Sequence, residues 1–217
     1  MKVYHYIICI SLSLSSFYSC QQKGTEEKES KKIVVEKMDI DSIFTDTNAI
    51  IIHKKDFNKI LKDHKTPKIA IEIYNGTYKA VDDSAIDLLE YLESENDLVR
   101  WFYFRVITDS YKYADGAYAE GLGSLGTAYI KGKTCEFADY FNNKEIFNEN
   151  DLETWANIVT LELAINDEIG NETTVLEFNK ILKDNSKNCT PSKKKTIDSF
   201  CEIIKKEWKI YRESNSQ

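Results

Sequence analysis

The sequence contains little proline, glycine or histidine. Its 217 residues include 2 prolines, 8 glycines and 3 histidines. So few breaking residues favour long helices over many short strands joined by turns. The shortage of histidine, with no cysteines at metal-ligand spacing, argues against a zinc site. We therefore expect no metal ion and no other cofactor.

The chain also has fewer basic than acidic residues. The chain has 29 lysines and arginines against 36 acidic residues, a formal net charge of −7. Affinity for nucleic acid depends on cations that neutralise phosphates, so we expect no nucleic-acid partner. The same acidity argues against a domain that lies flat on an anionic bilayer.

Motifs that identify a catalytic chemistry are missing as well. The sequence has no phosphate-binding loop and no dinucleotide fingerprint. Ser124 does not stand in the register of a Gly-x-Ser-x-Gly elbow. The three tryptophans lie on apolar helical stripes, so we expect them in the core and not on a sugar-binding surface. No catalytic residue is assigned from the sequence.

The N-terminus, in contrast, carries a recognisable segment. Lys2 precedes residues 6–19, which are apolar or hydroxyl-bearing and uncharged, and Cys20 follows at once. This length suits the apolar part of an export signal and is short of the about 20 apolar residues that span a membrane. We expect residues 1–19 to be a signal peptide.

This segment resembles the signal of a bacterial lipoprotein, although Phe17 and Tyr18 depart from the usual pattern before the cysteine. An ordinary cleaved signal is the alternative. The resemblance implies cleavage before Cys20 and lipid on Cys20, with the membrane as the first partner. Cleavage would remove one lysine and no acidic residue, which changes the net charge from −7 to −8.

Residues 20–38 would then be a flexible charged tether, because they open with a long polar run that has no core to join. Glu26, Glu27 and Glu29 resemble an address for the outer leaflet of an outer membrane, with a plain solvated linker as the alternative. We expect an exported protein anchored to the cell envelope, at the outer membrane, on its periplasmic face or at the cell surface.

Three cysteines remain beyond Cys20. Cys189 precedes a helix that holds Cys201 in its third turn, which separates the two by ~16–18 Å, far beyond the ~7 Å limit for a disulfide. If a disulfide forms, Cys135 is therefore the expected partner of one of them. Three thiols buried as small hydrophobes are the alternative.

Residues 39–217 are expected to form one all-α domain. Amphipathic patterns and cap residues predict helices over about 56–63, 84–92, 97–107, 116–132, 134–141, 150–165, 171–182 and 191–212. Residues 69–80 are ambiguous: they alternate around Asn75-Gly76 like a short β-hairpin, yet Thr66-Pro67 suits a helix start. We favour helix and keep the hairpin as the alternative.

Three short helices, ending at Leu92, Phe141 and Leu182, are each expected to pair with a longer neighbour. Their offsets of 49 and 41 residues lie near the ~40–47 of two-helix repeats. The pattern resembles armadillo or HEAT-like stacks, which implies stacked antiparallel helix pairs in a right-handed superhelix with a concave face. Five of the glycines lie between 116 and 132, which predicts close helix contact or a distorted helix.

Polar and aromatic residues are densest between 105 and 120. The candidate ligand- or partner-binding residues are Arg105, Asp109, Tyr113, Asp115, Tyr118 and Glu120. Arg105 and Asp109 are four apart, so they should form an ion pair on a helix. Asp115 and Glu120 offer the two carboxyl groups that a glycosidase needs. The alternative is that Asp115 caps a helix and Glu120 is solvated.

The sequence therefore predicts a lipid-anchored envelope protein whose helical domain binds an unknown protein or glycan. One alternative is an envelope glycan hydrolase that uses Asp115 and Glu120. The other is an inhibitor or immunity protein, whose acidity would suit a basic envelope-targeting enzyme.

Overall fold

A computed structural model describes residues 51–78, 83–165 and 172–215. They belong to one compact unit that begins at Asn48. The predicted signal peptide and tether lie outside the described residues, and so does Asn171, the predicted start of the helix over 171–182.

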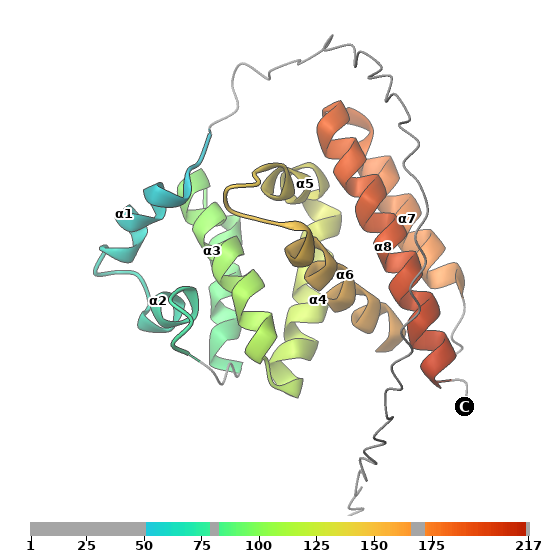
Figure 1. Ribbon diagram of the computed structural model, residues 1–217, viewed down its shortest axis with the longest axis horizontal. Coiled ribbons are helices and arrows are strands. Elements are labelled where there is room, and N and C mark those ends of the chain that lie inside the picture. The colour runs from blue at the N-terminus through green and yellow to red at the C-terminus, as the bar shows by residue number, and fades with distance from the viewer. Residues whose placement is uncertain (1–50, 79–82, 166–171, 216–217) are drawn as a thin grey trace, which may run out of the picture. The chain divides into compact units, whose positions relative to one another are not determined.

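The described residues are all-α, as predicted, and contain no strand. They form eight α-helices and four 3-10 helices, the latter labelled η. In chain order these are η1 (Lys54–Asp56), α1 (Phe57–Leu61), α2 (Lys68–Tyr74), η2 (Asp83–Glu93), α3 (Asp97–Ser110), η3 (Tyr111–Tyr113), α4 (Gly116–Gly132), α5 (Thr134–Asn142), α6 (Glu149–Ile165), α7 (Glu172–Asn185), η4 (Ser186–Asn188) and α8 (Pro191–Asn215). Figure 1 shows α1–α3 on one side, α7 and α8 on the other, and α4–α6 between them.

The ambiguous segment is a helix, α2, and the hairpin alternative near 69–80 is wrong. Gly76 has a φ of 67°, and its N–H donates to the carbonyl oxygen of Ile73 at 2.9 Å. The next N–H donates to the carbonyl oxygen of Glu72, also at 2.9 Å. These two bonds form a Schellman motif. The positive φ of the Asn-Gly pair therefore ends a helix and does not turn a hairpin.

The core is aromatic and is centred on α3. Phe104 is stacked between Tyr140, with ring centroids 4.0 Å apart, and Trp155, at 4.9 Å. The indole N–H of Trp155 donates to the hydroxyl of Thr108 at 2.9 Å. Buried residues surround the axis of α3 from Trp101 to Ile107, which is the central helix that the sequence predicts. All three tryptophans are buried, as expected.

Glycines on α4 allow its neighbours to approach closely, as predicted. A Cβ added at Gly126 would lie 2.8 Å from the Trp155 ring on α6. A Cβ at Gly121 would lie 2.6 Å from Ile86 of η2. Real Cβ contacts are not that short. A larger residue at Gly126 would have to displace the rigid Trp155 ring, whereas at Gly121 only the flexible end of the Ile86 side chain would have to move.

Each of the three short helices packs against a longer one: η2 against α3, α7 against α8, and α5 chiefly against α8. Phe137 of α5 meets Phe200 of α8 with ring centroids 4.8 Å apart, a contact between distant segments that helical periodicity does not reveal. The armadillo or HEAT-like likeness stays a prediction.

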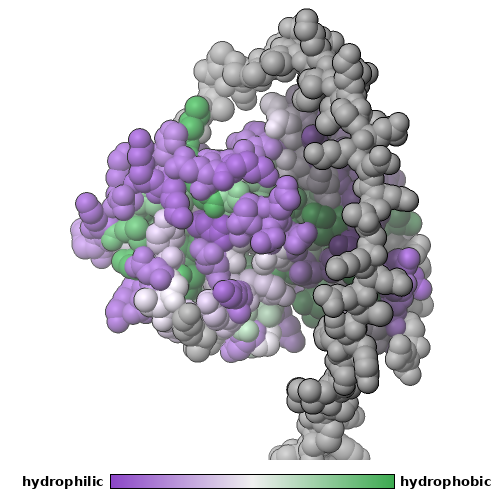
Figure 2. All heavy atoms as spheres, viewed as in Figure 1, coloured by the Kyte–Doolittle hydropathy of each residue, from purple (hydrophilic) through white to green (hydrophobic). Residues whose placement is uncertain are grey.

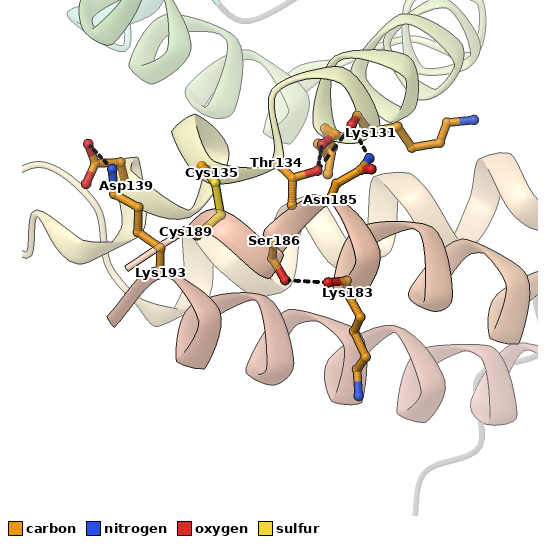
Figure 3. Close-up of a disulfide and its surroundings, with 10 residues drawn as sticks. Lys131, Thr134, Cys135, Asp139, Lys183, Asn185, Ser186, Cys189 and Lys193 are labelled. Atoms are coloured by element: carbon orange, nitrogen blue, oxygen red, sulfur yellow. Dashed lines mark hydrogen bonds and ion pairs between the residues drawn. A yellow bond between two sulfur atoms is a disulfide. The ribbon is translucent and has the colours of Figure 1, made fainter. Parts of the chain in front are cut away.

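A disulfide joins Cys135 to Cys189, whose Cα atoms are 5.5 Å apart. It agrees with the exclusion of a 189–201 bridge. In Figure 3 the disulfide lies between an ion pair, Asp139 to Lys193 at 3.2 Å, and a hydrogen bond from Asn185 to the carbonyl oxygen of Lys131 at 2.8 Å. These contacts fasten the α4–α5 corner to the segment that joins α7 to α8.

Candidate functional site

The six candidate residues do not form one surface. Arg105 and Asp109 line a cavity of about 320 Å³, whereas Asp115, Tyr118 and Glu120 lie at the start of α4 and Tyr113 on η3. Tyr118 is fully buried, and its hydroxyl lies 2.6 Å from that of Ser110. Burial raises its pKa to about 12. The Tyr118 ring fills the core.

The predicted ion pair on α3 is present and is larger than expected. Arg105 donates to both carboxylate oxygens of Asp109, from Nε at 3.0 Å and from Nη2 at 2.6 Å. It also donates to both oxygens of Asp151 on α6, at 2.7 and 2.9 Å. A fifth bond, at 3.2 Å, reaches the carbonyl oxygen of Ile146.

These five bonds use every N–H that a guanidinium offers. Asp151 has further hydrogen bonds. Its carboxylate accepts from the backbone N–H of Asn148 at 2.9 Å, and the Asn148 side chain accepts from the backbone N–H of Asp151 at 3.3 Å. This exchange caps α6, which begins at Glu149, one residue before the predicted start at 150. Arg105 therefore ties α3 to the start of α6 and has no donor left for a ligand.

The same cavity is completed by Lys54, Tyr74, Ile146 and Asn148. Burial raises the pKa of Asp109 above its ordinary value, against the opposing effect of Arg105. Burial also raises the pKa of Tyr74. Two aspartates face two cations here, so the cavity has no excess charge to attract an ion. The charged residues of this cavity therefore serve to link α3 to α6.

Asp115 and Glu120 are arranged as the non-catalytic alternative predicts. Asp115 precedes α4 and accepts a hydrogen bond from the N–H of Tyr118 at 2.7 Å. Both carboxylates belong to exposed residues. Five positions on an α-helix correspond to about 140° around its axis, so the two side chains leave α4 in different directions. Neither lines any of the cavities described here.

A larger cavity, which the sequence did not predict as a site, lies between η2 and α4. It has a volume of about 510 Å³ and is called the η2–α4 groove below. Its lining residues are Ile86, Asp87, Leu89, Glu90, Leu92 and Glu93 on η2, and Leu125, Ala128, Tyr129, Gly132 and Lys133 on and after α4. Most of them are apolar, so the groove has a hydrophobic floor.

The wall formed by η2 has an uncommon geometry. Runs of 3-10 helix rarely exceed 3–4 residues, yet η2 has 11. Side chains three positions apart eclipse in a 3-10 helix, so Asp87, Glu90 and Glu93 stand in one straight row, and all three are exposed. The row of Leu88 and Tyr91 turns inward, where Tyr91 stacks on Tyr103 of α3 at 3.8 Å.

The opposite wall is the exposed strip of α4. Leu125 is 48% exposed, although its spacing from Leu122 and Tyr129 places it on the apolar stripe of this helix. Ala128 and Gly132 continue the same strip and are also exposed. Alanine carries only a methyl group and glycine no side chain, so neither residue projects far from the helix. The Tyr129 hydroxyl points away from the groove to Glu136, at 3.2 Å, and Tyr140, at 3.0 Å. The groove is therefore apolar along its floor and acidic along one edge.

The sequence does contain an indication of this groove that helical periodicity missed. Polar residues recur every three positions at Ser84, Asp87, Glu90 and Glu93. On an α-helix each step of three lags by about 60°, so Ser84 and Glu93 would face opposite sides. Only a helix with three residues per turn keeps them together. A strict period of three is the pattern that could have indicated η2.

The described residues contain no group of three or more His, Cys, Asp or Glu side chains placed to hold a metal ion. No helix in this part of the chain is both long and apolar enough to cross a membrane. Hydrophilic residues predominate on the face shown in Figure 2, with smaller hydrophobic areas between them. Comparison of the chain with protein-family models, with curated proteins and with solved structures found no match.

Proposed function

We propose that this chain is a lipid-anchored protein of the cell envelope whose helical domain binds a protein partner. The η2–α4 groove is the observation that carries the proposal. It combines an apolar floor with exposed Leu125, and grooves of this kind, edged by polar residues, are typical of docking sites. The predicted cluster at Arg105 is less suited, because its donors are already bonded.

Export is supported by two independent features. The first is the segment that ends at Cys20, which resembles a lipoprotein signal. The second is the disulfide between Cys135 and Cys189. Disulfides persist in oxidising compartments outside the cytosol and are rare within it. Both features favour the periplasm or the cell surface, with the acidic residues after Cys20 favouring the outer membrane.

Binding is favoured over hydrolysis of an envelope glycan. Glycosidases place two carboxyl groups on opposite sides of the bond that is cut, whereas Asp115 is occupied as a helix cap. The acids of the groove stand in one row on one wall. The inhibitor or immunity alternative gains support from that row, since a basic target enzyme would meet it first.

The anchor can be tested by replacing Cys20. In the native bacterium, Cys20→Ser should abolish labelling by radioactive palmitate and release the protein from the membrane fraction. Mass spectrometry of the wild-type protein, prepared with thiols blocked and without reductant, should recover the peptide pair joined through Cys135 and Cys189. Labelling that persists in Cys20→Ser, or Cys135 and Cys189 recovered as free thiols, would contradict export with a lipid at this position.

Binding can be tested by site-specific photocrosslinking in intact cells. A photoreactive amino acid at position 125 should give one discrete adduct with a protein. The same amino acid at position 176 on α7, where Leu176 is 55% exposed, serves as the matched control and should give none. Equal, diffuse adducts at both positions, or adducts at neither, would refute a partner at the groove. An adduct with glycan would replace the protein partner with a carbohydrate one.

A further inference from the structure

We infer that the occupant of the η2–α4 groove is a short amphipathic α-helix of the partner, with lysine or arginine along one edge of its apolar stripe. The inference rests on the proposed function, which requires only that some protein binds there. It specifies the secondary structure, the charge and the orientation of the segment that does so.

Charge is the first argument. The groove is lined by three acidic residues and one lysine, Lys133. The Nζ of Lys133 already lies 3.9 Å from a carboxylate oxygen of Glu93, which leaves Asp87 and Glu90 as the stronger attraction. Both are exposed and stand on the same edge. An exposed acidic edge raises the association rate of a cationic partner and disfavours an anionic one.

Spacing is the second argument. Residues three apart on a 3-10 helix are separated by ~6 Å along its axis, from the ~2.0 Å rise per residue. Residues four apart on an α-helix are also separated by ~6 Å. A helix lying along η2 with cations at i and i+4 therefore matches Asp87 and Glu90 one to one. A third cation at i+7, ~10.5 Å from the first along the axis and about 20° around it, would face Glu93.

The length of the η2–α4 groove and the small residues that line it are consistent with an occupant helix of about two turns. The apolar row from Ile86 to Leu92 is ~12 Å long at the rise of a 3-10 helix, and the strip from Leu125 to Gly132 is ~10.5 Å long on α4. Two turns of α-helix measure about 11 Å. The small residues Ala128 and Gly132 would let the backbone of the occupant approach closely, while Leu125 would pack between its side chains.

An extended peptide fits this groove less well. Peptides that bind as strands gain most of their affinity from main-chain bonds to an exposed sheet edge. Both walls here are helices, whose N–H and C=O groups are bonded along their own axes. A strand would leave its own backbone groups unpaired above an apolar floor, which is unfavourable for each group that is buried. A helix satisfies those groups internally.

The test extends the crosslinking at position 125 by mapping the partner segment in the adduct. We expect a segment with apolar residues at i, i+3 or i+4, and i+7, flanked by lysine or arginine at i+4 spacing. Glu90→Lys should lower the yield of this adduct several-fold, whereas Glu177→Lys, at an exposed acid on α7, should leave it unchanged. A lysine-to-glutamate change in the mapped segment should restore the yield with Glu90→Lys.

The outcomes separate this inference from the proposed function. A discrete protein adduct whose segment is acidic, extended or without cations would overturn the basic helix and leave the proposed partner binding intact. The same holds if Glu90→Lys and Glu177→Lys have equal effects. An adduct with a second copy of this chain, or with its own residues 20–38, would overturn both the helix and an external partner. Absence of any specific adduct would overturn the proposed function itself.

Discussion

Two of the described regions are rich in acidic residues, and they differ in how exposed these residues are and in whether apolar surface lies beside them. At the Arg105 cluster, the guanidinium has five hydrogen-bond acceptors and Asp151 also caps α6. At the η2–α4 groove, Asp87, Glu90 and Glu93 are exposed above an apolar floor. Both regions are charged, but only the groove offers unfilled apolar surface. Density of charge in the sequence therefore does not identify a binding site.

The largest effect should follow the loss of Arg105. Arg105→Met would leave Asp109 and Asp151 without their cation, and breaking a buried pair in this way destabilises proteins by about 3–5 kcal/mol. Urea unfolding should show that loss, and acidification should partly restore stability because it neutralises the orphaned carboxylates. Lys68→Met, which removes an exposed ion pair with Glu72, is the matched control and should change stability little. Equal effects of the two changes would mean that Arg105 is free to bind ligand.

Gly126→Ala tests whether close packing holds α4 in place as a groove wall. The new methyl would meet the Trp155 ring at 2.8 Å, and overpacking of this kind costs about 1–3 kcal/mol. Thermal unfolding should reveal the loss, and the tryptophan fluorescence should shift as the ring moves. Unchanged stability and fluorescence would show that α4 and α6 tolerate a wider separation.

Gly132→Ala makes the same substitution at a glycine of α4 that lines the groove and is not packed against a neighbouring helix. A Cβ there has no atom within 4 Å, and a glycine-to-alanine change without strain stabilises a protein by about 0.4–1 kcal/mol. We expect a slightly higher midpoint in urea together with a lower crosslinking yield from position 125, because the methyl occupies space in the groove. A gain in stability with full crosslinking would show that the occupant does not reach this end of α4.

The smallest effect concerns the pH dependence of stability. Burial raises the pKa of Asp109 in the folded protein above the ordinary value of 3.8, so the folded state holds this proton more tightly than the unfolded state. The associated stability is present below pH 3.8 and is lost as the pH rises through the raised pKa. Asp109→Asn cannot titrate, so its stability should change less over that interval. A curve parallel to the wild type would assign the titration to another group.

The sequence predicted those helices in which a cap residue stands directly before an amphipathic pattern. Asn96 accepts from the N–H of Val99 at 3.3 Å and caps α3 just before its predicted start at 97, and Asp115 caps α4. Asp109 was correctly paired with Arg105 because i and i+4 contacts are local. Asp151 could not be found in the same way, since it is 46 residues from Arg105 and meets it only when α6 packs against α3.

Two errors arose from assuming that apolar residues on a helical stripe are buried and that all helices have 3.6 residues per turn. Leu125 follows the stripe of α4 but is half exposed, because η2 leaves the groove open above it. The row from Ser84 to Glu93 was treated as part of an ordinary amphipathic helix. Its three-residue period was visible in the sequence, but only the packed structure shows that a cavity lies beside it.

The buried thiol of Cys201 has a consequence for how the chain is oxidised. In the folded protein Cys201 is fully buried, and burial raises its pKa to about 11, which suppresses the reactive thiolate. Before α8 forms, the Cys201 thiol is not buried and its pKa is not raised by burial. Cys189 is then 12 positions from Cys201 but 54 from Cys135, and the shorter loop closes about tenfold more readily.

Oxidation of the unfolded chain should therefore favour the bridge between Cys189 and Cys201, which the native α8 excludes. Correct pairing requires that α8 forms first or that a disulfide isomerase rescues the mispaired chain. Disulfide mapping after oxidation in strong denaturant should recover the short loop, and Cys201→Ser should refold to the native bridge in higher yield. With Cys201 as a third thiol in this domain, the disulfide that forms depends on the order in which folding and oxidation occur.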